Sequence, residues 1–187
     1  MKAIMIIATM FLFGCASKEI NLYGDAPKND SEIAILDSSC DKKCEASIKE
    51  SINVNDQEYQ VGEIIVLSIN GKYGTGTFYD DRGAFNATWD GAFKIKVNPG
   101  KQDILSKPNY YRAHPLMERK FSFEAEEGSQ YFVGRLLILS GKSYDDSYAW
   151  TPVVMNKTTS SIIYPEGKPE WQGENIQSVP IYVPIVY

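Results

Sequence analysis

Residues 121–139 read F-S-F-E-A-E-E-G-S-Q-Y-F-V-G-R-L-L-I-L, and the fold is decided here. Apolar and polar side chains alternate over residues 121–125, which is the period of a β-strand with one buried face. An E-G pair then provides a turn, and residues 131–139 form a longer apolar strand whose only charge is Arg135. The stretch therefore predicts two neighbouring strands joined by a turn.

More strands are predicted on both sides of this pair. Residues 92–97 show the same alternation, and residues 63–70 form a dense β-branched run that ends in an N-G hairpin-turn pair. The other candidates are residues 32–37, 75–79, 101–105 and 150–155. No convincing amphipathic helix is visible. The sequence therefore predicts an all-β fold, an antiparallel β-sandwich in a single domain.

The chain begins with the pattern of an export signal. Lys2 precedes an apolar run over residues 3–13, which is too short for a bilayer-spanning helix of roughly 20 residues but suits a signal-peptide core. The run ends in Leu12-Phe13-Gly14-Cys15, which resembles the bacterial lipobox, although Phe13 departs from the usual small or β-branched residue. That resemblance implies a signal peptide over residues 1–14 and lipid on Cys15.

The remaining boundaries follow from composition. Residues 15–31 are polar and are expected to form the lipidated N-terminus and a tether. Residues 32–187 are expected to form the sandwich, with residues 178–187 as an extended C-terminal strap because their two prolines cannot donate to a sheet ladder. In enteric-type bacteria, an Asp directly after the lipidated cysteine retains a lipoprotein in the inner membrane. The residues after Cys15 lack this Asp, so by resemblance to that rule we expect the outer membrane.

The charge of the chain excludes some partners. The formal net charge is -5, which argues against nucleic acid and against electrostatic docking on anionic lipid. Attachment to a membrane is therefore expected only through the lipid on Cys15. Several acyl chains on one cysteine hold a protein stably without a basic patch.

The other two cysteines stand in a C-x3-C spacing, at Cys40 and Cys44. In an exported protein a local disulfide is the expected pairing, because the periplasm is oxidising. Free thiols, metal binding and redox exchange are the alternatives. Metal binding would need further ligands, and His114 is the only histidine. We expect no metal and no cofactor.

Side chains that could carry catalysis are sparse. His114 has no recognisable nucleophile beside it, and no G-x-S-x-G elbow is present. Glu124, Glu126 and Glu127 could flank a glycoside, but a solvated strand end explains them. A set of aromatic residues (Tyr144, Tyr148 and Trp150) in a polar loop is the best candidate for a partner surface.

Three turns in the centre of the chain carry a resemblance. They are S-I-N-G-K at residues 68–72, V-N-P-G-K-Q at residues 97–102, and F-E-A-E-E-G-S-Q-Y at residues 123–131. Their order and spacing resemble small bacterial lipoproteins with PEGA-like or DUF2846-like β-sandwich domains, although Gln102 stands where that group often has His. The resemblance covers about 70 residues and implies a fold and a location, since the group has no common reaction.

These features together favour a non-enzymatic, lipid-anchored envelope protein that binds or positions another envelope protein or a glycan. Two alternatives stay open. One is a structural subunit of a secretion machine, by analogy with outer-membrane lipoproteins of type VI secretion. The other is a hydrolase that acts on glycans.

Overall fold

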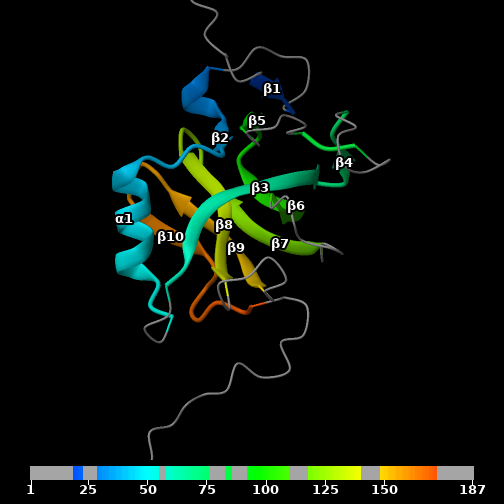
Figure 1. The fold of residues 1–187 in the computed structure, drawn as a ribbon. Helices are drawn as coiled ribbons and strands as arrows, with labels where there is room; N and C mark the ends of the chain where they lie inside the picture. Colours follow the sequence, from blue (N-terminus) through cyan, green and yellow to red (C-terminus); the bar gives the residue numbers. More distant parts are fainter. Residues whose placement is uncertain are drawn as a thin grey trace, which may run out of the picture.

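In the computed structural model the described residues are 19–22, 29–54, 58–75, 83–85, 92–109, 118–139 and 148–171 (Figure 1). They form strands for the most part, which confirms the all-β class. The elements in chain order are β1 (Glu19–Asn21), the 3-10 helix η1 (Asp30–Glu32), β2 (Ala34–Asp37), α1 (Lys42–Ser51), β3 (Gln60–Ile69), β4 (Lys72–Tyr73), β5 (Lys94–Val97), β6 (Gly100–Pro108), β7 (Arg119–Ala125), β8 (Gln130–Leu139), β9 (Tyr148–Asn156) and β10 (Ser161–Tyr164).

β8 is the central strand. Along one edge it pairs antiparallel with β9, with Val133 opposite Val154, and β9 continues to β10. Along its other edge β8 pairs first with β2 in parallel and then with the start of β3 in antiparallel orientation. β2 continues to β5, and β5 to β1, which is a second parallel pairing.

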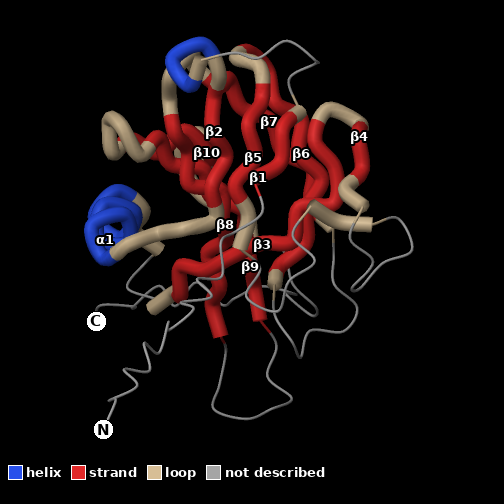
Figure 2. Tube along the Cα trace, turned by 90° about the horizontal axis from the view of Figure 1, so that it is seen from above, coloured by secondary structure: helices blue, strands red, loops and turns tan. Residues whose placement is uncertain are grey.

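β3 carries the sheet around a corner. Its residues 60–63 pair with β8, whereas Ile64–Ile69 pair with β6, and β6 then pairs with β7. The sheet therefore curls into an open half-barrel, seen from above in Figure 2. The two parallel pairings make the sheet mixed, so the antiparallel sandwich is not confirmed. Crossover segments place those strands side by side, and strand patterns alone do not reveal crossovers.

The main core fills the inside of the curl. Buried side chains from seven strands meet there, and Tyr131 and Trp150 are the largest of those that are fully buried. Because β8 is also covered on its outer face, its side chains are buried on both sides. This explains why its sequence reads as a nearly continuous apolar run.

α1 covers the outer face of β8 and β9. Asp41 caps its first turn by accepting a hydrogen bond from the Cys44 backbone N at 2.8 Å. Cys44, Ile48 and Ile52 then pack on Phe132 and other side chains of β8 and β9. The prediction that no amphipathic helix is present is wrong. The apolar stripe of α1 is only one residue wide, at spacings of four, so it is easily missed.

The predicted tether is also corrected in part. β1 lies inside residues 15–31, and its Ile20 packs with Leu22 against the main core. The Leu22 backbone N donates to the carbonyl of Lys96 at 2.8 Å. Residues 19–22 therefore belong to the folded domain. The C-terminal strap, residues 178–187, lies outside the described residues.

Candidate functional site

Trp150 does not lie on a partner surface, contrary to the prediction. Its side chain is 0% exposed in the main core, and its backbone pairs with Leu137 of β8. The alternation of β9 places residues 150 and 154 on the core side. Tyr144 and the side chain of Tyr148 lie outside the described residues, so only the Trp150 part of that prediction is tested.

The predicted N-terminal site lies outside the described residues. This applies to all four lipobox residues (Leu12, Phe13, Gly14 and Cys15), and also to His114. Their assignment rests on the sequence alone.

The predicted disulfide is present between Cys40 and Cys44, with a Cα–Cα distance of 5.3 Å. Cys40 follows β2, and Cys44 lies in the first turn of α1, where its side chain is buried in the outer cluster beneath the helix. The bridge therefore ties the end of a central strand to the start of the helix. A loop this short gives a modest stabilisation in the chain-entropy model.

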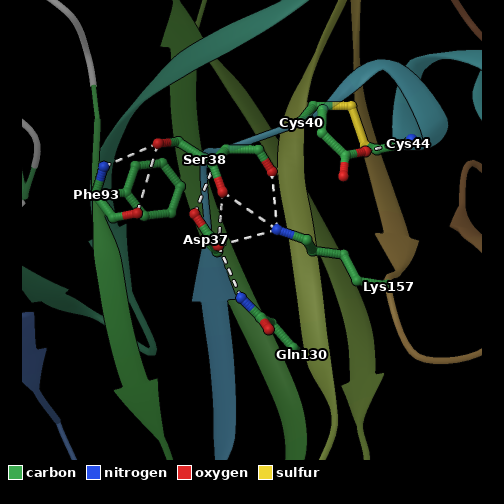
Figure 3. A network of polar contacts seen from close by, with 9 residues as sticks. Asp37, Ser38, Cys40, Cys44, Phe93, Gln130 and Lys157 are labelled. Atoms are coloured by element: carbon green, nitrogen blue, oxygen red, sulfur yellow. Dashed lines mark hydrogen bonds and ion pairs between the residues drawn. A yellow bond between two sulfur atoms is a disulfide. The ribbon is translucent and has the colours of Figure 1, made fainter.

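A network of polar side chains surrounds the loop that carries this disulfide (Figure 3). Asp37 Oδ2 accepts hydrogen bonds from Ser39 Oγ and Gln130 Nε2, each at 2.8 Å, and lies 3.0 Å from Lys157 Nζ. Asp37 Oδ1 accepts from the Ser39 backbone N at 2.8 Å. Lys157 also donates to the carbonyl of Ser39 at 3.0 Å.

The same loop is joined to β5 through Ser38. Its backbone N donates to the carbonyl of Phe93 at 3.1 Å, and its Oγ accepts from the Phe93 backbone N at 2.9 Å. The network thus connects the ends of β2 and β5 with β8 and with the turn that follows β9 (Figure 3).

The electrostatics of Asp37 show what this network can do. Burial would raise the pKa of the Asp37 carboxyl, but the hydrogen bonds from Ser39 and the ammonium of Lys157 outweigh it and hold the pKa below its ordinary value. Both oxygens accept hydrogen bonds, and the donors come from Ser39, from Gln130 of β8 and from Lys157 in the turn after β9, so the carboxylate links these segments. The arrangement is a structural cross-link.

Replacing Asp37 with Asn is expected to lower the free energy of unfolding at pH 7 by about 1–3 kcal/mol, because an amide leaves buried donors without a charged acceptor. The Asp37 side chain is 12% exposed and that of Lys157 is 24% exposed, so solvent screens the pair only in part. Urea unfolding of both proteins measures the difference.

The pH dependence gives a second readout of the same variant. The folded pKa of Asp37 lies below the unfolded one, so the carboxylate stabilises the fold above about pH 4. That contribution is lost as the pH falls through the folded pKa. The difference in free energy of unfolding between wild type and Asp37→Asn should therefore disappear in that pH range. Asp103→Asn, at a carboxylate that is 58% exposed, is the matched control and should shift stability much less. A difference in free energy of unfolding that stays constant down to pH 3 contradicts a stabilising ion pair between Asp37 and Lys157.

A groove lies where the two ends of the curled sheet approach each other. Its volume is about 350 Å³. It is bordered by Ser122 of β7 and by Tyr164 at the end of β10. The segment that follows β10 contributes Pro165, Glu166, Lys168 and Glu170. The rings of Phe121 and Tyr164 have centroids 5.1 Å apart and hold the two sides together. The groove thus presents an aromatic ring, charged groups of both signs and a strand edge.

Arg119 fixes the far side of this groove. Its side chain is only 7% exposed, and its guanidinium donates to the carbonyl and to the carboxylate of Glu170, the latter at 3.2 Å. Glu170 itself is 89% exposed. Because Arg119 already holds Glu170, this pair orients the segment after β10, and the groove remains open to solvent.

The acids that the sequence offered for glycoside chemistry have solvated side chains. Glu124, Glu126 and Glu127 are all exposed around the β7–β8 turn. Within the described residues, no three His, Cys, Asp or Glu side chains gather closely enough to hold a metal ion. The same part of the chain contains no helix that is long and apolar enough to cross a membrane.

The groove residues were missed by sequence reasoning. Ser122 and Tyr164 are far apart in the chain, and neither belongs to a motif. Only the curl of the sheet brings them together, so no local pattern could have identified them.

Comparisons with protein-family models, with curated proteins and with solved structures return no match for this chain.

Proposed function

We propose that this chain is a non-enzymatic lipoprotein of the bacterial cell envelope. Lipid on Cys15 anchors it in the outer membrane, and its folded domain binds or positions another envelope component. The domain offers an open groove with groups suited to binding, while the polar network around Asp37 is a structural cross-link.

The observation that carries this proposal is the Cys40–Cys44 disulfide. A structural disulfide is typical of an oxidising compartment such as the periplasm. The bridge uses two of the three cysteines of the chain, which leaves Cys15 as the one available for another purpose. Cys15 is also the residue at which the apolar N-terminal run ends.

The position of β1 supports a domain held close to the membrane. Only three residues separate Cys15 from Glu19, where β1 begins. Four residue steps of at most about 3.6 Å each span no more than about 14 Å. A lipid on Cys15 therefore keeps the β1 edge of the sheet near the bilayer surface.

The likeness to PEGA-like and DUF2846-like sandwiches is part of the proposal. It is supported by the turns at residues 70–71 and 127–128, which lie between strands. The corner in β3 also supports it, because β3 pairs first with β8 and then with β6, and strands on the two sides of a corner can face each other across a core. In this interpretation the half-barrel is a sandwich whose layers share a continuous strand.

Metabolic labelling tests the anchor. Radiolabelled palmitate should enter the wild-type protein in a bacterial host, and the label should be lost from Cys15→Ala because acylation needs the thiol. The double variant Cys40→Ala with Cys44→Ala is the matched control, since it removes the other two cysteines but keeps Cys15, and it should label like the wild type. Equal labelling of Cys15→Ala and wild type refutes the anchor.

Crosslinking tests the binding role separately. The full-length lipoprotein should recover an envelope protein or a glycan after crosslinking in cells. Cys15→Ala, which lacks the acceptor for the lipid, should recover less of it. A wild-type protein that is lipidated but recovers no envelope component contradicts the binding role and leaves the anchor intact.

A further inference from the structure

Asn70 and Gly71 are the only Asn-Gly pair in the chain, and they form the turn between β3 and β4. Both residues are exposed and adopt positive φ, 51° at Asn70 and 76° at Gly71. A glycine has no side chain to hinder the approach of its backbone nitrogen to a neighbouring group. The nitrogen of Gly71 can therefore attack the side-chain amide of Asn70, which is the first step of deamidation.

Two hydrogen bonds hold the Asn70 side chain against β6. Its Nδ2 donates to Gln102 Oε1 at 3.0 Å, and its Oδ1 accepts from the Asp103 backbone N at 2.8 Å. The Asn70 backbone N also donates to the carbonyl of Asp103 at 2.8 Å. Both polar atoms of the side-chain amide are thus fixed, so the amide can turn toward Gly71 only when these bonds break.

Gln102 is a polar side chain that is only 2% exposed. Its Nε2 donates to the carbonyls of Asn98 and Gly100, at 2.8 and 3.0 Å. These bonds determine which end of the Gln102 amide faces Asn70, since only the nitrogen can donate to a carbonyl oxygen. The oxygen is therefore left for Asn70, and the two side-chain amides join the β3–β4 turn to the segment before β6.

We propose that Asn70 is a deamidation site that the fold protects, and that the side chain of Gln102 provides much of the protection. In the reaction the Gly71 nitrogen loses its proton and attacks Asn70 Cγ. A bond forms between that nitrogen and Cγ, the bond from Cγ to Nδ2 breaks, and Nδ2 leaves as ammonia with the proton. Water then opens the ring, which leaves aspartate or isoaspartate at residue 70.

The product no longer fits the contact with Gln102. A carboxylate has no N–H, so residue 70 can no longer donate to Gln102 Oε1. Gln102 cannot exchange the two ends of its amide without losing its bonds to Asn98 and Gly100. Two acceptors then face each other, which leaves a buried polar group without its partner and is unfavourable. Deamidation therefore loosens the β3–β4 turn from β6, and water does not restore the amide.

The rate of deamidation with and without the fold tests the protection. The purified full-length protein and a synthetic peptide of residues 66–74 are incubated side by side in mildly alkaline buffer. Peptide mapping by mass spectrometry gives the fraction deamidated at residue 70. The folded protein should react at least about tenfold more slowly than the peptide, because hydrogen bonds at both ends of the amide have to break first. Equal rates overturn the proposal.

Two substitutions on β6 test the role of Gln102. Gln102→Leu is apolar and of similar size but offers no acceptor to Asn70 Nδ2, so deamidation should become about fivefold faster. Asp103→Ala is the matched control. It removes an exposed carboxylate but keeps the backbone N–H that binds Asn70 Oδ1, so its rate should stay close to that of the wild type. Circular dichroism checks that both variants fold. A Gln102→Leu variant that folds but reacts no faster than Asp103→Ala refutes the role of Gln102.

Asn70→Asp reproduces one product and tests the contact even if Gln102→Leu does not fold. It should unfold at a lower urea concentration than the wild type, measured in high salt to screen the exposed carboxylate of Asp103. In a Gln102→Leu background the same change should have little effect, because the bond that it removes is already absent. If Asn70→Asp is as stable as the wild type, the Asn70–Gln102 bond does not hold the turn and the proposal fails.

Discussion

Trp150→Ala is expected to lower the free energy of unfolding by about 3–5 kcal/mol, which is the range for truncating a large aromatic residue in a core. Trp150 is 0% exposed, and its side chain points from β9 into the main core. The side chains that surround Trp150 are held on paired strands, so they can fill the cavity only in part. A loss of this size is a large part of the stability of an ordinary domain.

Urea unfolding of the purified protein measures this effect, and Tyr73→Ala is the matched control. Tyr73 is an aromatic residue that is 47% exposed, so its truncation should change the free energy of unfolding by no more than about 0.5 kcal/mol. Trp150→Phe should cost less than Trp150→Ala. The buried Nε1 of Trp150 has no hydrogen-bond partner among the described residues, so its removal forfeits no bond. Similar values for Trp150→Ala and Tyr73→Ala would show that Trp150 does not lie in the core.

Local alternation was enough to predict several strands. Residues 121–125 fall within β7, and residues 131–139 fall within β8. These strands were predictable because the order of apolar and polar side chains along each strand indicates which faces are buried. Residues 92–97 likewise contain β5. The N-G pair ends β3 as expected, since Asn70 and Gly71 both adopt positive φ. In these cases the information lies within a few neighbouring residues.

Features that depend on distant neighbours were not predictable. The parallel pairing of β2 with β8 needs the whole intervening chain to cross over. The helix α1 has only a narrow apolar stripe, and its burial depends on the outer face of β8. Trp150 lay in a sequence that suggested a polar aromatic loop, and only the register of β9 against β8 decides which way it points.

The candidate binding groove belongs to the same category. Its walls come from β7 and from the segment after β10, and the two meet because the sheet curls back on itself. The direction of the β7 backbone depends on its register with β6, which the sequence does not specify. The cysteine pair was predictable for the opposite reason, since four residue steps determine whether the thiols can meet.

Gly134→Ala is expected to destabilise the protein by about 2–3 kcal/mol through overpacking. A Cβ at Gly134 would lie 2.1 Å from Phe132 Cζ and 2.6 Å from the carbonyl oxygen of Gly62 in β3. The Phe132 ring is 0% exposed and occupies the space over Gly134 beneath α1. The missing side chain at residue 134 thus makes room for the ring on which the helix packs.

Gly62→Ala on the neighbouring strand is the matched control, because its Cβ would approach the Arg135 side chain only to 3.2 Å, and a shift of a few tenths of an ångström relieves that contact. Gly62→Ala should lower the free energy of unfolding clearly less than Gly134→Ala does. At Gly134 the new Cβ would meet the backbone oxygen of Gly62, which is held in place by the pairing of β3 with β8. Urea unfolding gives both values, and hydrogen exchange of α1 amides locates the damage. Faster exchange in α1 of Gly134→Ala is expected, because a displaced Phe132 ring pushes against Ile48 and Ile52. Equal losses in free energy of unfolding for Gly134→Ala and Gly62→Ala would mean that the Phe132 ring can shift without loosening α1.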